Sequence, residues 1–91
     1  MPNVEIGQIH FAPRFFKSFD KLPKSIQTLS TKKDEMFCKN PFDPILHTHK
    51  LKGKLVGAWS YSVNYEYRVL FRFIKSNEVI YYDIGTHEIY K

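Results

Sequence analysis

Two short stretches of the chain gather residue types that can move protons and bind phosphate. Residues 47–54 read HTHKLKGK, and the chain closes on DIGTHEIYK, residues 83–91. Imidazole titrates near neutral pH and therefore suits a general acid or base. Lysine ammonium groups bind phosphate and release its counterions. The two stretches therefore direct attention to proton transfer beside a polyanionic partner.

The overall charge agrees with such a partner without selecting one. Fourteen Lys and Arg stand against nine Asp and Glu, which gives a formal charge of +5 and an isoelectric point near 9.4. A basic surface favours nucleic acid, but many small domains carry this charge as an ordinary solvated surface. Charge alone therefore leaves both interpretations open.

Length and composition predict a single domain over residues 1–91, with room for one core. No apolar run approaches the roughly 18 residues of a membrane span, so we expect a soluble protein. No secretory signal is visible at the start of the sequence. The one cysteine, Cys38, cannot form an internal disulfide and falls on the apolar face of an expected helix. These features predict a cytoplasmic location.

Hydrophobic periodicity predicts an α+β fold in the order β-α-α-β-β-β. Residues 4–11 read as a first strand, and two helices follow, one opening at Pro13 and one running from Pro23 to Asn40. Two prolines within residues 41–44 then allow only a loop or a short turn. Three strands follow, with connections at 64–66 and 76–77. Two N-terminal helices should therefore pack on one face of a mostly antiparallel sheet.

Strand alternation also predicts which side chains the sheet exposes. Val69, Phe71 and Phe73 share a parity suited to the core, which turns Arg68 and Arg72 to the opposite face. A lone helical layer would leave that face open and basic. Trp59 and Tyr61 fit core packing better than an RNA-stacking platform, because they share their parity with Val63.

The order of these motifs resembles a known family. The run NPFDPILHTHKLKGKLVGAWSYSVNYEYRVLFRFI, followed by VIYYDIGTHEIYK, is similar to the RelE/ParE toxin superfamily and nearest its YafQ-like branch. The most specific pieces are HKLKG, a strand carrying YRVLF, and GTH followed shortly by an aromatic residue. The resemblance spans essentially the whole chain and implies a RelE-like fold.

The resemblance implies a toxin of a type II toxin–antitoxin system that cleaves messenger RNA, in many relatives within the ribosomal A site. The implied reaction needs no metal and no other cofactor. We expect no membrane partner. The ribose 2'-hydroxyl attacks the adjacent phosphate, which requires a base, cations for the phosphorane charge and an acid for the 5'-oxygen. A cognate antitoxin should hold the toxin inactive, and we expect it to cover Arg68, Arg72 and the HKLKGK loop with acidic and apolar side chains.

Carried over residue by residue, the resemblance implies the site residues. Arg68 is a candidate for holding the scissile phosphate and His87 for the general acid. The implied catalytic residues are His49, Glu66, Arg68, His87 and Tyr90. The predicted RNA-binding residues, which rest mainly on charge and on the exposed sheet face, are Lys50, Lys52, Lys54, Tyr67, Arg72 and Lys91.

Two positions depart from the branch. Ser62 stands where the branch has a histidine, and Asp83 where it has an arginine. Tyr90 follows His87 by three positions, where YafQ has four. Arg68, Arg72 and the lysines of KLKGK can supply the missing positive charge, and the alternative is a weakly active or inactive member.

Structural interpretations stand beside the catalytic ones. His47 reads as a solvated loop residue, because the family motif uses His49, and a zinc site at residues 47–49 lacks further ligands. His49 and His87 can also be interpreted as ordinary surface histidines, and the loop lysines as a solvated surface. Glu66 can be interpreted as an ion-pair partner of Arg68 or of a lysine. Two rival functions remain: a ParE-like inhibitor of DNA gyrase that cuts nothing, and a basic RNA-binding module without catalysis.

Overall fold

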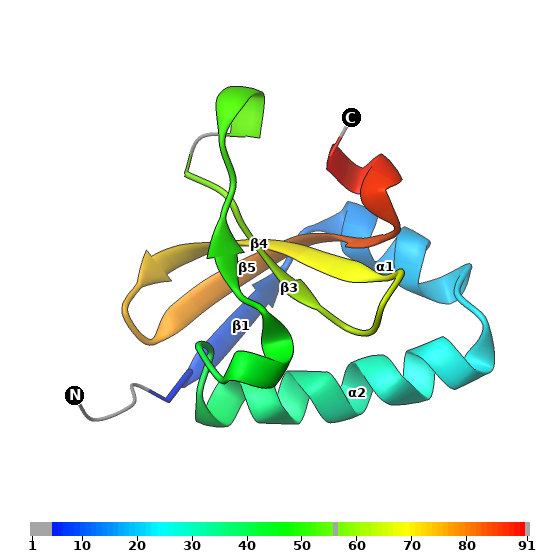
Figure 1. The fold of residues 1–91 in the computed structure, drawn as a ribbon, viewed down its shortest axis with the longest axis horizontal. Coiled ribbons are helices and arrows are strands. Elements are labelled where there is room, and N and C mark those ends of the chain that lie inside the picture. The colour runs from blue at the N-terminus through cyan, green and yellow to red at the C-terminus, as the bar shows by residue number, and fades with distance from the viewer. Residues whose placement is uncertain (1–4, 56, 91) are drawn as a thin grey trace.

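The chain folds into a five-stranded sheet with two helices, in the order β1-β5-β4-β3-β2 (Figure 1). This computed structural model describes residues 5–55 and 57–90. The strands and helices are β1 (Gln8–Phe11), α1 (Pro13–Asp20), α2 (Lys24–Lys39), β2 (His49–Lys50), β3 (Trp59–Ser62), β4 (Arg68–Lys75) and β5 (Glu78–Gly85). Three short 3-10 turns are η1 (Pro44–Leu46), η2 (Gly53–Leu55) and η3 (His87–Tyr90). The predicted α+β class is confirmed.

The sheet is antiparallel except at one edge. β1 pairs parallel with β5, with Gln8 opposite Glu78 and Phe11 opposite Tyr81. The predicted strand at 4–11 is therefore shorter, and Val4 lies outside the described residues. The ladder begins after Gly7 because the Ile6 amide donates to the carbonyl of Cys38, at 2.7 Å, and is tied to the end of α2 instead. The additional strand, β2, is a two-residue ladder against β3, within a stretch we expected to be loop.

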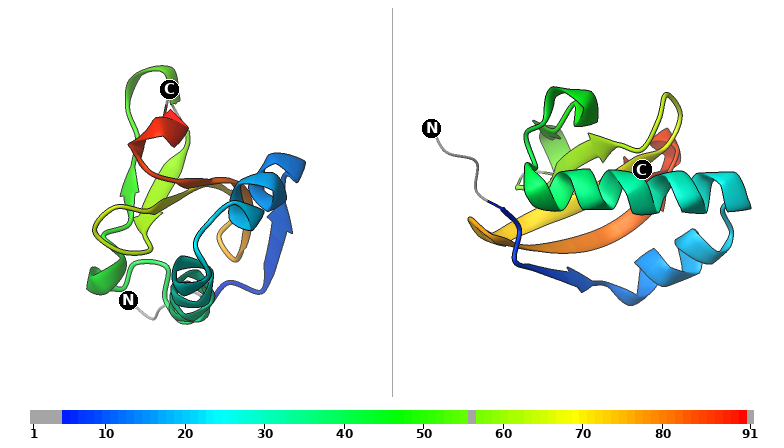
Figure 2. Two further views of the ribbon diagram at one scale, coloured as in Figure 1. Left: turned by 90° about the vertical axis from the view of Figure 1, so that its right-hand side faces the viewer. Right: turned by 90° about the horizontal axis from the view of Figure 1, so that it is seen from below.

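The two helices form because proline and phenylalanine are placed for it. Pro13 occupies the first turn of α1, where its missing N–H costs nothing. Phe15 and Phe19, one turn apart, stack with ring centroids 6.0 Å apart. Gln27 of α2 donates to the carbonyls of Phe19 and Leu22, so α2 supplies the hydrogen bonds that the end of α1 lacks. α2 crosses one face of the sheet, and α1 lies beside the C-terminal half of β5 (Figure 2).

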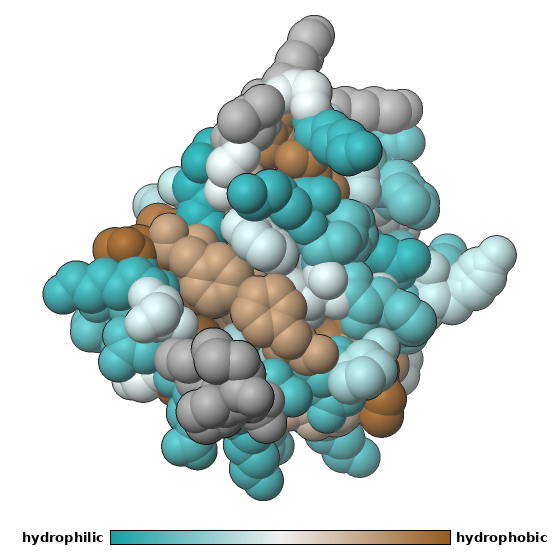
Figure 3. All heavy atoms as spheres, turned by 60° about the vertical axis from the view of Figure 1, so that its left-hand side comes forward, coloured by the Kyte–Doolittle hydropathy of each residue, from teal (hydrophilic) through white to brown (hydrophobic). Residues whose placement is uncertain are grey.

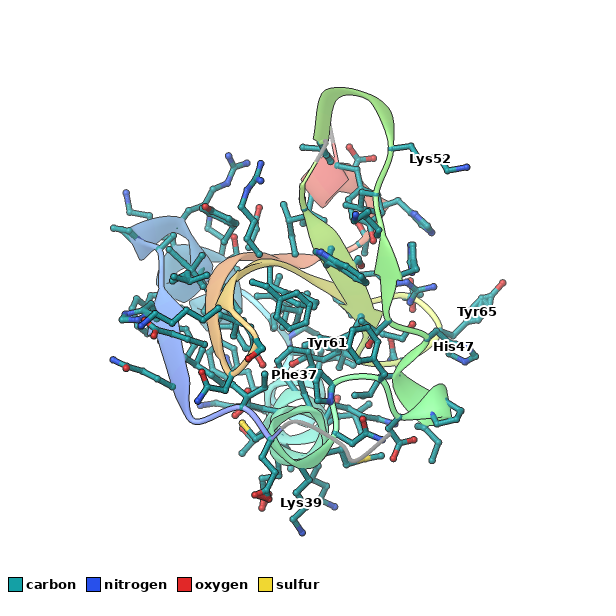
Figure 4. All side chains as sticks on the ribbon, turned by 90° about the vertical axis from the view of Figure 1, so that its left-hand side faces the viewer. Phe37, Lys39, His47, Lys52, Tyr61 and Tyr65 are labelled. Carbon is teal, nitrogen blue, oxygen red and sulfur yellow. The ribbon has the colours of Figure 1, made fainter. Side chains whose placement is uncertain are left out.

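The core lies between α2 and the sheet, as the strand parity predicts. Phe37 of α2 is fully buried, with its ring 4.7 Å from Tyr61 and 4.9 Å from Phe71. Figure 4 shows Phe37 and Tyr61 facing one another there. Val69 and Phe71 are fully buried on the same face. Interlocked aromatic rings therefore fix the position of α2 against the central strands.

The opposite face is less open than expected. Ser62 lies opposite Arg68 in the β3–β4 ladder. Ser60, on the same face, is fully buried, and Leu70 is almost so. The C-terminal turn η3 folds back toward this face, on the side of the sheet away from α2 (Figure 1). The last residues of the described chain therefore cover part of the predicted basic surface.

An aromatic cluster extends the core to the surface. The Phe42 ring stacks on Phe73 at 5.9 Å, and Trp59 meets Phe73 edge to face. The side of the molecule that carries the β4–β5 turn shows an apolar band among hydrophilic side chains (Figure 3). In the described ranges, no helix combines the length and apolar character that crossing a membrane requires.

Candidate functional site

A single cavity brings together two imidazoles and two cations from four parts of the chain. It has a volume of about 590 Å³, opens to solvent, and we call it the histidine cavity. Its charged and titratable lining residues are Lys33 of α2, His47 after η1, Arg68 of β4 and His87 of η3. The other lining residues are Ile45, Ser62, Val63, Asn64 and Tyr65.

His47 enters the cavity through a backbone bend. It follows η1 with φ 51°, in the left-handed region, where histidine is among the more tolerated residues. Its amide donates to the carbonyl of Pro44, and the neighbouring Leu46 is fully buried and anchors the turn. His47 and Tyr65 project outward on the same side of the molecule (Figure 4), and both line the cavity.

His49 is exposed on β2 and does not line the histidine cavity in the described structure. Its Nδ1 lies 2.9 Å from the carbonyl oxygen of His47. A carbonyl oxygen can only accept, so Nδ1 must carry the proton and Nε2 keeps its lone pair in the neutral ring. In the neutral ring the hydrogen bond to His47 therefore leaves Nε2 as the free acceptor, two residues along the chain from the cavity-lining His47.

Arg68 clamps the β3–β4 turn from within the cavity. Its Nη1 donates to the carbonyl of Asn64 at 2.6 Å, and contacts those of Tyr65 and Tyr67 at 3.1 and 3.3 Å. No acceptor for Nε or Nη2 is found among the described residues. A guanidinium has five N–H donors, so these two nitrogens retain donors for a phosphate.

His87 and Tyr90 lie on the same side of η3. Their ring centroids are 5.8 Å apart, because residues three apart eclipse one another in a 3-10 helix. The Tyr90 hydroxyl lies 2.5 Å from Oγ of Ser60, which ties the turn to β3. A Cβ at Gly85 would come within 2.8 Å of Ile89, so glycine there lets η3 fold closely over the end of β5. The spacing of three thus still brings the aromatic ring against the histidine.

The other implied catalytic and stacking residues lie outside the cavity lining. Glu66 is exposed in the β3–β4 turn, where its amide donates to Oδ1 of Asn64. Tyr67 is half-buried and packs against the core, because it shares the parity of Val69. Tyr65, 85% exposed at the same turn, is the aromatic side chain that lines the cavity.

The basic residues do not form one cluster. Lys50 places Nζ 5.6 Å from the centroid of the Trp59 ring, facing away from His49 because neighbours on a strand alternate. Lys52 is exposed at the tip of the β2–β3 connection, well away from His47 (Figure 4). The guanidinium of Arg72 lies against Gly57, whose φ is 88°. A Cβ at Gly57 would collide with this guanidinium. Lys91 and the side chain of Lys54 lie outside the described part of the chain.

Two further groups fall outside the cavity for clear reasons. Asp83 is buried against α1, with Oδ2 3.1 Å from Nε of Arg14 and Oδ1 accepting from the Ser18 hydroxyl at 2.5 Å. Its carboxylate therefore completes the packing of α1. Burial raises the pKa of Cys38 to about 11, with the charge of Asp34 adding to the effect, so this thiol is unreactive at neutral pH. Within the described residues, no three His, Cys, Asp or Glu side chains gather in a metal-binding arrangement.

The lining residues that sequence reasoning did not assign to the site include Lys33, His47 and Tyr65. Lys33 has a visible signal, because it continues the helical stripe of Leu29 and Phe37 at intervals of four, where an apolar residue would be expected. Tyr65 falls in a turn and belongs to neither strand parity, so it has no core to pack on. His47 stood in a conspicuous stretch but was interpreted as a solvated loop residue, because its direction depends on the bend after η1.

Comparisons with solved structures agree with this architecture. The RelBE2 toxin–antitoxin complex of Mycobacterium tuberculosis contains a chain that matches with TM-score 0.78 and 17% identity, over 96% of this chain and 98% of that one. YafQ from E. coli matches with TM-score 0.73 and 14% identity, over 90% and 94%. The YoeB dimer of Staphylococcus aureus matches with TM-score 0.70 and 21% identity, over 88% and 95%.

Sequence comparison alone is silent. No protein-family model matches this sequence, and neither does any curated protein. The structural matches lie below 25% identity, so what they establish is the fold. The chain has the fold of the RelE, YafQ and YoeB toxins.

Proposed function

We propose that this protein is a toxin of a type II toxin–antitoxin system, a member of the RelE/ParE superfamily that cleaves messenger RNA without a metal. The observation that carries the proposal is the convergence of His47, His87, Lys33 and Arg68 on the histidine cavity. Two imidazoles beside two cations supply the proton transfers and the charge stabilisation of phosphodiester cleavage. The shared fold with three toxins supports the same assignment.

The proposed reaction is an internal transesterification. A base removes the proton of the ribose 2'-hydroxyl, and the 2'-oxygen attacks the adjacent phosphorus. The bond from phosphorus to the 5'-oxygen breaks, and an acid protonates that oxygen. The products are a 2',3'-cyclic phosphate and a 5'-hydroxyl. Protons balance because the base takes up one proton while the acid gives up one.

Named side chains take the roles in this proposal. His87 is the acid, and His47 is the base, because both line the same cavity. Arg68 and Lys33 bind the phosphate oxygens as negative charge grows. His49 is the alternative base, since its Nδ1 bonds the carbonyl of His47 and leaves Nε2 as the nitrogen that can accept a proton in the neutral ring. Tyr65, being largely exposed at the cavity, provides a ring on which a base can stack.

The partners follow from the same proposal. The substrate is messenger RNA in the ribosomal A site, and the inhibitor is a cognate antitoxin in the same cytoplasm. Among the solved structures of this fold, the RelBE2 structure and a YoeB–YefM structure are complexes of toxins with their partners. An acidic antitoxin segment lying over Arg68 would neutralise the cavity and exclude RNA.

The test is cleavage of RNA by the purified protein in EDTA, with and without ribosomes programmed with messenger RNA. We expect fragments ending in a 2',3'-cyclic phosphate and a 5'-hydroxyl. His87→Gln should reduce this cleavage by roughly 10²- to 10⁴-fold, the usual scale for a lost acid or base. His10→Gln is the matched control, because His10 lies on β1 with its Nε2 against Glu78 and away from the cavity. Intact RNA in both settings, with gyrase–DNA cleavage complexes stabilised instead, would overturn the proposal in favour of a ParE-like poison.

A further inference from the structure

A second hollow lies between the two helices, and its lining differs from that of the histidine cavity. It has a volume of about 400 Å³, and we call it the phenylalanine groove. Its aromatic lining residues are Phe11, Phe15, Phe16, Phe19 and Tyr81. Phe11 and Phe16 are 40% and 53% exposed, although their rings meet at 5.2 Å. Neighbouring exposed phenylalanines on one groove are typical of an interaction surface rather than of scattered surface residues.

The charges in the groove have the opposite sign to the protein as a whole. The chain carries +5, yet the carboxylates of Asp20 and Asp34 line the groove. No Lys, Arg or His of the described chain lines it. An acidic, aromatic groove on a basic protein is complementary to a cationic side chain that carries an apolar stem, because guanidinium pairs with carboxylates and stacks on aromatic faces.

The carboxylate of Asp34 is bound by a neutral hydroxyl group. Oδ1 accepts a hydrogen bond from the Tyr81 hydroxyl at 2.6 Å, and the Tyr61 hydroxyl lies 3.1 Å from that of Tyr81. No basic group within the described residues pairs with Asp34. Desolvation raises the pKa of Asp34, and the negative charge of Glu35 raises it further. The hydrogen bond from Tyr81 lowers this pKa in part. Asp34 is half-buried, and a carboxylate partly withdrawn from water is stabilised by a nearby cation, so a partner's guanidinium would supply a counterion.

We propose that the phenylalanine groove is the docking site for a peptide segment of another protein that presents an apolar anchor beside an arginine. The apolar side chain lies against Phe11 and Phe16, and the guanidinium meets the carboxylates of Asp34 and Asp20. The groove shares no lining residue with the histidine cavity. The docking surface is therefore independent of the proposed RNA cleavage, and either assignment can fail without the other.

The test uses a defined probe and matched variants of the full chain. The probe is a fluorescein-labelled, end-blocked peptide whose centre reads Leu-Arg-Phe-Leu-Arg, followed by fluorescence anisotropy and by amide chemical shifts. Its control peptide carries citrulline for both arginines, which keeps the shape and removes the charge. Asp34→Asn is paired with Glu35→Gln, the exposed neighbouring carboxylate on α2. Phe16→Ser is paired with Phe42→Ser, because Phe42 is also 53% exposed and packs on two aromatic rings elsewhere.

We expect the peptide to bind with shifts at α1 and α2. Asp34→Asn, Phe16→Ser and the citrulline peptide should each weaken binding by about tenfold or more, whereas Glu35→Gln and Phe42→Ser leave it unchanged. Cleavage of RNA, where present, should be the same in all four variants. Absence of binding, equal binding of the citrulline peptide, or equal losses in the control variants would overturn the proposal. Self-association of the chain through Phe16 would also overturn it, by making the occupant a second copy.

Discussion

Lys33 and Asp34 are consecutive on α2, and their side chains line different hollows. Lys33 lines the histidine cavity, and Asp34 lines the phenylalanine groove. Consecutive helical residues point about 100° apart, so a helix that lies between two recesses can serve both. A basic and an acidic side chain thus stand on two different flanks of the same helix. Variants at these two positions can separate what each hollow does.

The base of the proposed reaction is decided by comparing two histidines. His47→Ala should reduce RNA cleavage by roughly 10²- to 10⁴-fold, because His47 shares the cavity with His87. His49→Ala should cost less than about tenfold, because His49 loses only its bond to the His47 carbonyl. Single-turnover cleavage of a short RNA measures both. The reverse order of losses would assign the base to His49, as the family resemblance implies.

Arg68 should be sensitive to the shape of its side chain as well as to its charge. Arg68→Lys keeps one positive charge, but it cannot both hold the Asn64 carbonyl and present a fork to phosphate. We expect cleavage to fall by about 10²-fold or more, the scale of losing one preorganised donor, with little change in melting temperature. Arg68→Ala removes the clamp on the turn as well, so a lower melting temperature in that variant alone would agree with the structure. Full activity in Arg68→Lys would leave this arginine a purely structural role.

Asp34 predicts a particular pH dependence of stability. Burial raises its pKa above the ordinary value of 3.8, so the folded protein holds this proton more tightly than the unfolded chain. Its contribution to the free energy of unfolding is therefore fully present below pH 3.8 and lost as the pH rises through the raised value. Asp34→Asn does not titrate. We therefore expect the free energy of unfolding of this variant, measured relative to the wild type by urea unfolding at several pH values, to increase as the pH rises above 3.8. A difference that does not change with pH would contradict this prediction.

The paired tyrosines predict unequal effects of removing one hydroxyl. While Asp34 is ionised, the Tyr81 hydroxyl donates to it and accepts from the Tyr61 hydroxyl. Tyr81→Phe should cost about 1–3 kcal/mol of unfolding free energy, because the fully buried Tyr61 hydroxyl loses its partner. Tyr61→Phe should cost only about 0.5–1.5 kcal/mol, since the bond to Asp34 survives. Urea unfolding at neutral pH measures both, and equal costs would mean that the chain of bonds is not directional.

The sequence by itself determined the class of fold and the direction of most strand residues. Alternation along 69–73 placed Val69 and Phe71 in the core and turned Arg68 to the opposite face, whereas its pairing with Ser62 is a matter of register that only the structure shows. Local periodicity suffices for these because a strand has two faces and the apolar one must be buried. The contact between the rings of Tyr90 and His87, by contrast, depends on one turn of 3-10 helix that the sequence pattern did not predict.

Only the tertiary structure decided which charged and titratable side chains meet. Lys33, His47, Arg68 and His87 come from separate elements, and their convergence depends on how α2, η1, β4 and η3 pack. The sequence assigned both His49 and Lys50 to the site. In the structure their two-residue ladder pairs His49 with Ser60 and places Lys50 over the ring of Trp59. His47 owes its direction to a single left-handed residue after η1. Periodicity assigns a side chain to a face, whereas the meeting of distant residues depends on the packing that brings those faces together.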